Sequence, residues 1–385
     1  MLRAARISVA AVFLIHGMIV SNWLSRIPAV KQALGLSVSA LGVALLGSSF
    51  GALLAMALIS RLIARVGSAR VTRWSTFAFC AVLPLPALAR GPVSLTLFLA
   101  VYGAMAGCME VAMNTQAVDV ERRYARPVMV GFHALFSLGG MLGAGLGGVA
   151  ASLGISPLMH LPVAALVLAT AAIFATRSLL IEEKEPQTGL LAGHWTFRPI
   201  LGLAAIAFCI LLGEGAMADW STVYLTRFTG QGMAATGYSV FSLMMAVGRL
   251  SGDWLRARVG SVLMVRAGSA LAAIGLGGAL AAGGLAPALI GFACAGAGWA
   301  SIFPIVSGAA GHKSPWQPEA GVAAVSATGF FAFLVGPPLI GFIAQASTLR
   351  TGLAVVVGLS ALAAMLAGVV RDADRGLKAT GADPA

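Results

Sequence analysis

Charged residues are scarce in this chain. Lys, Arg, Asp and Glu together make up only 10% of its 385 residues, whereas hydrophobic residues make up 59%. Long polar stretches are as rare, and the one that stands out runs from Arg177 to Arg198. With a mean hydropathy of +0.93, this composition excludes a soluble globular domain of this length and predicts a membrane protein.

Patterns that would indicate catalysis or metal binding are also missing. The four cysteines all fall inside apolar segments, and no pair has the spacing of metal ligands: Cys80, Cys108, Cys209 and Cys294. The many glycines are spread along apolar segments and form no phosphate-binding loop. No catalytic triad can be assembled. We therefore expect a protein that is not an enzyme, with no cofactor and no metal.

Twelve apolar segments account for almost the whole chain. Each is close to the roughly 20 residues that cross a bilayer, and none alternates as a barrel strand would, so we expect all of them to be helices. The predicted segments are 6–26, 38–60, 71–89, 93–117, 128–151, 156–176, 199–225, 236–254, 262–282, 285–310, 319–346 and 351–370.

The positive charges indicate the orientation. The net charge of +12 could suggest nucleic-acid binding, but five of the 25 Lys and Arg residues fall on one side of the predicted spans and the other 20 on the opposite side. The smaller set is Arg26, Lys31, Arg90, Arg227 and Arg350. By the positive-inside rule, both termini are cytoplasmic. We expect a multi-pass protein of the bacterial inner membrane, with no nucleic-acid partner, and a first helix that is retained.

The two halves of the sequence resemble each other. Ala64-Arg65-Val66-Gly67-Ser68 follows the second segment, and Ala257-Arg258-Val259-Gly260-Ser261 follows the eighth. His16-Gly17 in the first segment corresponds to Glu214-Gly215 in the seventh. Such self-similarity indicates duplication of a six-helix unit. The predicted domains are a bundle over 1–176, a cytoplasmic linker over 177–198, a second bundle over 199–371 and a cytoplasmic tail over 372–385.

A chain of two parallel six-helix halves has the architecture of major facilitator transporters, although another polytopic protein with a duplicated bundle is an alternative. The loop after the second segment resembles the superfamily motif G-x-x-x-D-R-x-G-x-[RK], with Arg65, Gly67 and Arg70 matching and Ala64 replacing the acid. The resemblance implies a cytoplasmic gate formed by Arg65, Gly67, Arg70 and Arg258, with Asp119 as a possible ionic partner or as part of a solvated loop.

A narrower resemblance covers nearly the whole chain. The segments that carry it are Asn22-Trp23-Leu24-Ser25-Arg26-Ile27-Pro28, Glu110-Val111-Ala112-Met113-Asn114, Gly131-Phe132-His133, Glu214-Gly215 with Asp219-Trp220, and Gly336-Pro337-Pro338. Together they are similar to YbjJ-type inner-membrane transporters, a branch similar to fucose–proton symporters. In those symporters a Glu followed four residues later by Asn carries the proton and contacts sugar. The resemblance implies these roles for Glu110 and Asn114.

Ionisable residues inside membrane spans are costly and are therefore candidates for function. Glu110, Glu214 and His16 are the candidates for proton coupling, because a buried carboxyl group or imidazole can exchange a proton near neutral pH. His16 occupies the repeat position of Glu214 and could share a proton with a carboxylate. The alternatives are a Glu110 permanently paired with a buried partner and a structural His16 that donates to a carbonyl.

Polar residues near these groups are the candidates for binding substrate: Asn22, Asn114, Asp219, Trp220 and His133. Asn114 lies one helical turn after Glu110 and shares its face. Asp219 is five residues from Glu214, and the alternative for it is a pair with Arg227 or Arg26 at the outer gate. For His133 the alternative is helix packing or an inner gate.

These observations favour an all-α membrane protein with 12 transmembrane helices in two pseudo-symmetric bundles. Its expected function is proton-linked secondary transport of a small polar organic solute, with sugars favoured, and its expected partners are this solute, protons and the bilayer. A monomer is expected. A proton-driven efflux antiporter for amphipathic compounds and a sensor that does not transport are the competing hypotheses.

Overall fold

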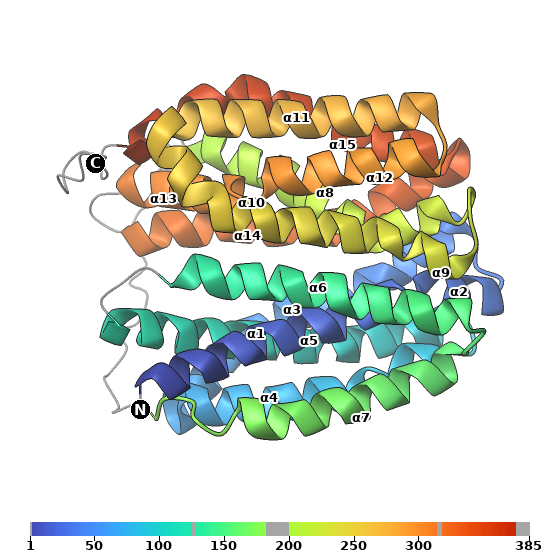
Figure 1. Ribbon diagram of the computed structural model, residues 1–385, viewed down its shortest axis with the longest axis horizontal. Helices are drawn as coiled ribbons and strands as arrows, with labels where there is room; N and C mark the ends of the chain where they lie inside the picture. Colours follow the sequence, from blue (N-terminus) through green and yellow to red (C-terminus); the bar gives the residue numbers. More distant parts are fainter. Residues whose placement is uncertain (1, 125–127, 182–199, 314–317, 375–385) are drawn as a thin grey trace.

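The computed structural model describes residues 2–124, 128–181, 200–313 and 318–374, and helices account for nearly all of these residues (Figure 1). Residues 182–198 of the predicted linker and 375–385 of the predicted tail lie outside the described ranges. The first half contains α1 (Leu2–Leu24), α2 (Ile27–Ala33), α3 (Val38–Val66), α4 (Ser68–Val82), the 3-10 turn η1 (Leu85–Leu88), α5 (Pro92–Tyr124), α6 (Met129–Ser152) and α7 (Pro157–Ala175). The second half contains α8 (Leu201–Leu225), α9 (Gln231–Ala234), α10 (Thr236–Val259), α11 (Ser261–Ala282), α12 (Leu285–Trp299), α13 (Ile302–Lys313), α14 (Pro318–Ala346), α15 (Leu349–Leu366) and η3 (Ala367–Asp374).

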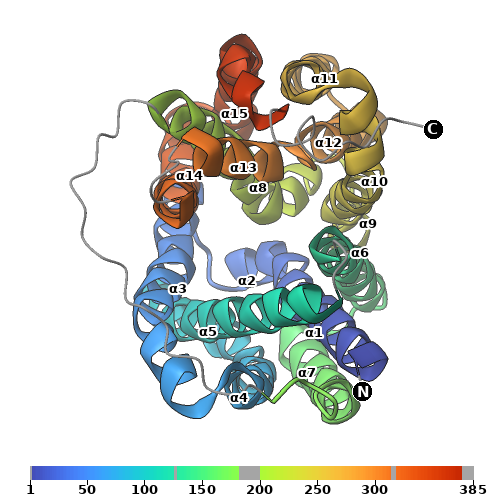
Figure 2. The same ribbon diagram turned by 90° about the vertical axis from the view of Figure 1, so that its left-hand side faces the viewer.

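The helices form two groups that follow the order of the chain. Figure 2 shows α1 to α7 on one side and α8 to α15 on the other. The groups meet along two pairs of neighbouring helices, α3 with α14 and α6 with α10. The start of α1 and the end of η3 lie at the same end of the molecule (Figure 1). Following the predicted orientation, we call this the inner end and the opposite one the outer end. The predicted fold class, an all-α protein with paired six-helix bundles, is confirmed.

Eleven helices in the described ranges are long and apolar enough to cross a membrane. The remaining predicted span is α10, whose 24 residues would extend over about 36 Å, more than the bilayer core requires. It falls short in hydropathy because its second half carries four charged residues: Arg249, Asp253, Arg256 and Arg258. One of them, Arg249, is only partly exposed and lies against the other half of the protein, as described below.

Several boundaries differ from those predicted. The helices α3 and α5 continue about two turns beyond the apolar segments 38–60 and 93–117, to Val66 and Tyr124. The sequence pattern marks where apolar residues end, whereas a helix can continue into water with polar side chains. The predicted segment 285–310 is divided between α12 and α13 at Ala300 and Ser301. The first helix, α1, ends at Leu24, two residues before the predicted end of the segment 6–26. A separate helix, α2, then begins with Pro28 in its first turn.

Glycines on two faces of α6 allow it to pack closely against one helix of its own half and one helix of the other half. A Cβ atom on Gly139 or Gly143 would meet backbone atoms of α1, at Leu14 and Met18 respectively. A Cβ on Gly140 would meet the Ser242 side chain of α10. Small residues allow this close approach of helices in membranes. As a result α6 is packed between α1 of its own half and α10 of the other half, which places its polar groups at the contact between the halves.

Candidate functional site

The central polar cluster joins α1 to α5. The imidazole Nδ1 of His16 lies 3.2 Å from Oε2 of Glu110, and Nδ2 of Asn114 donates to Oε1 of the same carboxyl group at 3.0 Å. Asn114 also donates to the backbone carbonyl of Glu110 at 2.8 Å. The four-residue spacing thus brings Glu110 and Asn114 together, and His16 adds the third member from a different helix.

This cluster lies deep in the membrane-spanning part of the protein. Glu110 is the nineteenth residue of the 33 in α5, and His16 is buried between the rings of Phe79 and Phe136 at centroid distances of 5.4 and 5.3 Å. The side chain of His16 is 4% exposed, whereas that of Glu110 is 33% exposed. The carboxyl group therefore has a buried partner on one side and accessible space on the other.

A second charged pair lies in the other half. Arg249 on α10 has Nη2 at 3.9 Å from Oε2 of Glu214 on α8. Its Nη1 donates to the backbone carbonyl of His133 at 3.1 Å and to Oγ of Ser137 at 2.8 Å, both on α6. The side chains of Arg249 and Glu214 are 18% and 16% exposed. Arg249 thus connects a candidate carboxylate of one half to the backbone of the other half.

Arg249 is not among the candidates predicted from the sequence, where it counts only as one of the inner-side charges. The sequence does contain a signal for Arg249, because this residue lies inside the predicted segment 236–254 and an ionisable residue inside a span is a candidate for function.

His133 lies between the two clusters. Its ring meets the Phe13 ring edge-on at a centroid distance of 5.2 Å, and it lies within electrostatic range of Glu110, His16 and Arg249. The predicted candidates His16, Glu110, Asn114, His133 and Glu214 are therefore brought into one region at the contact between the halves. Within the described ranges, no group of three or more His, Cys, Asp or Glu residues could hold a metal ion.

Three predicted binding residues, Asn22, Asp219 and Trp220, lie toward the outer end, and they differ from one another in burial and hydrogen bonding. Asn22 is buried and donates back to the Met18 carbonyl of its own helix at 2.7 Å. Trp220 is fully buried, and neither its Nε1 nor Oδ1 of Asn22 has a hydrogen-bond partner in the described part of the chain. Asp219 is partly exposed. The side chains of Asn22 and Trp220 are thus buried in this conformation, and the binding roles of all three residues stay predictions.

The suggested partners of Asp219 make other contacts. Arg26 is buried and donates to the carbonyls of Gly147, at 3.3 Å, and of Ile155. Arg227 lies over the rings of Tyr224 and Phe228.

The outer end is closed by a reciprocal contact between the halves. The short helix α2 follows α1 and packs on α8 of the second half, and α9 follows α8 and packs on α6 of the first half. Gln231 of α9 donates to Gln32 of α2 at 2.7 Å. A Cβ on Gly148 of α6 would lie only 2.8 Å from the Gly232 carbonyl of α9. We call α2 and α9 together the outer clasp.

The predicted cytoplasmic gate residues lie at the inner end. Arg65, Arg70 and Arg258 are exposed, and in the described part of the chain none of them forms an ion pair with Asp119. Oδ2 of Asp119 is buried and has no hydrogen-bond partner there. The Arg258 guanidinium instead lies 4.0 Å from the centroid of the Trp254 ring. The proposed gate contacts are thus not made in this conformation, and the gate role stays a prediction.

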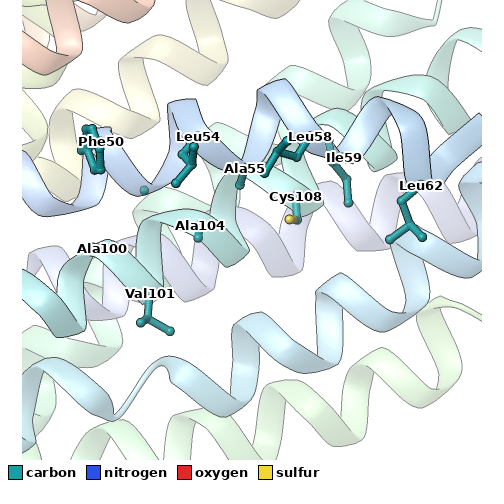
Figure 3. Close-up of a pocket in the computed structure, with 11 residues that line it drawn as sticks. Phe50, Leu54, Ala55, Leu58, Ile59, Leu62, Ala100, Val101, Ala104 and Cys108 are labelled. Carbon is teal, nitrogen blue, oxygen red and sulfur yellow. The ribbon is translucent and has the colours of Figure 1, made fainter.

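A separate apolar groove of about 550 Å³ lies between α3 and α5 (Figure 3). Phe50, Leu54 and Leu58 of α3 line it, and each is more than half exposed. Ala104 and Cys108 line it from α5. No Asp, Glu, His, Lys or Arg side chain lines this groove. It is therefore not the site of a polar solute.

The chain is similar to known transporters along most of its length. The Major Facilitator Superfamily profile matches residues 9–319. An uncharacterized MFS-type transporter of Yersinia pestis is 35% identical over 351 residues, covering 89% of this chain and 90% of the relative. The membrane protein MosC of Rhizobium meliloti is 31% identical over 364 residues, covering 93% of this chain and 88% of the relative.

Two solved structures show the same fold at low sequence identity. The nucleoside transporter NupG superimposes with a TM-score of 0.70 at 16% identity, covering 95% of this chain and 98% of that one. A D-xylose-proton symporter superimposes with a TM-score of 0.73 at 13% identity, covering 94% of this chain and 96% of that one.

Proposed function

This chain belongs to the major facilitator superfamily, and we propose that it is a proton-coupled secondary transporter of a small polar organic solute, with a sugar-like compound favoured. Protons, the solute and the lipid bilayer are its partners, and a monomer is the functional unit. It resides in the bacterial inner membrane with both termini in the cytoplasm, as the distribution of Lys and Arg favours.

The observation that carries this proposal is the contact of Glu110 with His16 and Asn114. A carboxyl group in the middle of a membrane span, one-third exposed and 3.2 Å from an imidazole, can take up a proton from the accessible side. Its neighbour Asn114 supplies an amide that can donate to and accept from hydroxyl groups. Protonation and solute binding thus involve the same few atoms, which is the requirement for coupling them.

The position of Glu110 supports alternating access. The outer clasp closes the outer end, so we take the exposed part of Glu110 to be reached from the inner end. If the halves rock about α3–α14 and α6–α10, the same carboxyl group becomes accessible from outside. The fold is shared with a D-xylose-proton symporter; its named activity is consistent with this proposal.

The test is transport by purified protein in liposomes with an imposed pH gradient. A thermal-stability screen against sugars and related metabolites first identifies a solute, since a ligand that binds the native state raises its stability. Glu110→Gln keeps the size and hydrogen bonding of the side chain but removes its charge. We expect solute exchange to persist and proton-driven accumulation to fail. Asp253→Asn, which alters an exposed acid on α10, is the matched control and should behave as wild type.

Accumulation by Glu110→Gln at the wild-type level would exclude Glu110 as the proton carrier and leave Glu214 or His16 for that role. The direction of the gradient that drives movement also separates the hypotheses. Symport and efflux antiport respond to opposite pH gradients, and a sensor moves no solute under either gradient.

A further inference from the structure

The contact between α6 and α10 is polar along its length. Ser242 Oγ of α10 donates to the Ser137 carbonyl of α6 at 2.8 Å, and Ser239 Oγ donates to the Met141 carbonyl at 3.3 Å. Arg249 extends this row toward the inner end through its bonds to Ser137 Oγ and the His133 carbonyl. These bonds join the two halves of the protein, so any rocking between the halves must stretch or exchange some of them.

Arg249 differs from the two serines because it always carries a positive charge. Its hydrogen bonds go to α6 of the other half, whereas the carboxylate that it faces belongs to α8 of its own half. The 3.9 Å separation between Arg249 Nη2 and Glu214 Oε2 is longer than a hydrogen bond. The guanidinium therefore makes hydrogen bonds to α6 across the interface, whereas its contact with Glu214 in its own half is too long to be a hydrogen bond.

We propose that Arg249 is a positioning residue that transmits the charge state of Glu214 to the contact between the two halves. This inference rests on the proposed function. When Glu214 is neutral, the guanidinium stays on the α6 carbonyl and hydroxyl groups and holds α6 against α10. When Glu214 is ionised, a charge-assisted bond to the carboxylate competes for the same donors, since such bonds are stronger than bonds to neutral acceptors. The contact with α6 then weakens at its inner end.

Other charged or titratable groups surround this pair and must be considered in any pH experiment. His133 of α6 lies within electrostatic range of the guanidinium, and Tyr238 of α10 lies within electrostatic range of Arg249, Glu214 and Asp219. Across the interface lie Glu110 of α5 and His16 of α1. Variants at Glu214 and at Arg249 are therefore both needed to assign an effect to this pair.

The experiment measures the spacing of the two helices without any solute. Spin labels are attached to Val130→Cys on α6 and Val259→Cys on α10, in full-length protein whose four native cysteines are replaced by alanine. Distance distributions are recorded in lipid nanodiscs between pH 5 and pH 9. The variants are Arg249→Gln, Arg249→Lys and Glu214→Gln. The control is Arg266→Gln, which alters an exposed arginine on α11 of the same half.

We expect the wild-type distribution to shift toward longer distances as the pH rises. Glu214→Gln should keep the short distance at every pH, and Arg249→Gln should show a longer distance that no longer depends on pH. Arg249→Lys keeps the charge and should retain part of the shift, whereas Arg266→Gln should match wild type. A wild type without a shift, or an Arg249→Gln variant that keeps the wild-type shift, overturns the proposal.

A purely structural role for Arg249 would change the distance but leave its pH dependence intact. Failure of this proposal is also distinct from failure of the proposed function. The liposome assay with Glu110→Gln reports on proton-driven accumulation, whereas the spin-label distances report on Arg249 and Glu214 with neither solute nor gradient present.

Discussion

Gly67 and Gly260 end repeat-related helices with nearly the same backbone geometry, although 193 residues separate them. Their φ angles are +88° and +78°, and each donates its N–H to the carbonyl four residues earlier, Ile63 or Arg256, at 2.8 Å. Each glycine then precedes the next helix, α4 or α11, without a longer loop. The repeated sequence Ala-Arg-Val-Gly-Ser thus forms the same tight connection between helices in both halves. The positive φ at this connection explains why the residue there is glycine.

Replacement of Gly67 should therefore destabilise the protein through the backbone alone. No atom would lie within 4 Å of an added Cβ, but positive φ with extended ψ is nearly confined to glycine and costs other residues about 1–3 kcal/mol. We expect Gly67→Ala to lower the thermal unfolding temperature of the purified protein. Gly278→Ala, on α11, is the control, because it also has open space but no positive φ. Equal effects of the two changes would contradict this explanation.

Parts of the fold and site could be predicted because they depend on local spacing. Apolar length predicted twelve spans, and eleven helices in the described ranges are long and apolar enough to cross a membrane. The four-residue interval from Glu110 to Asn114 placed both residues on one helical face. The contact of His16 with Glu110 depends instead on how α1 packs against α5, which no local pattern specifies. The repeat had aligned His16 with Glu214, yet the carboxylate at ion-pair distance from it is Glu110, in the same half. The outer clasp could not be predicted for the same reason. Its two short helices are defined by their packing against the opposite half, which the local sequence does not specify.

The predicted orientation can be tested by labelling cysteines placed at two exposed serine positions. Ser178 follows α7 at the inner end and Ser347 lies between α14 and α15 at the opposite end, and both are exposed. In intact cells, an impermeant thiol reagent should label Ser347→Cys and leave Ser178→Cys unlabelled until the membrane is opened. The two changes are chemically identical, so each is the control for the other. The reverse pattern would show that the termini are not cytoplasmic.

The repeated arginines at the inner end predict a loss of transport without a loss of insertion. Arg65 and Arg258 are exposed, and neither forms an ion pair with a carboxylate of the described residues, so their expected role is to hold a different conformation. We expect Arg65→Ala/Arg258→Ala to lower the initial transport rate roughly fivefold or more, within the usual range of conformational coupling. Membrane yield should match wild type. Arg90→Ala, an exposed change at the outer end, is the control; a normal rate in the double variant would rule out the gate.

The buried imidazole predicts a dependence of coupling on His16. With the ring packed between Phe79 and Phe136 and directed at Glu110, His16→Gln keeps a polar side chain but cannot carry a positive charge. We expect the pH dependence of transport to change, because Glu110 loses a partner that can be charged. The measurement is the initial rate in liposomes over a range of pH values. His312→Gln, a change at the inner end of α13, is the control, and a profile unchanged by His16→Gln would exclude this role.

The outer clasp predicts a cross-link that arrests transport. Gln32 and Gln231 meet through their side-chain amides at 2.7 Å, and they belong to opposite halves. In a cysteine-free background, Gln32→Cys and Gln231→Cys should therefore be joined by a short bifunctional thiol reagent. Because the outer end must open for a solute to enter or leave there, the joined protein should lose transport while the uncross-linked double variant keeps it.

The reagent itself is controlled by the two single-cysteine variants, which it can modify but cannot link. Cleavage of a reducible linker should restore transport, which separates a conformational block from damage to the protein. If cross-linked protein continues to transport at the rate of the single-cysteine variants, the clasp does not open during the cycle. The halves would then have to move about the outer end as a fixed point, and the solute would need a path to the outside that avoids α2 and α9.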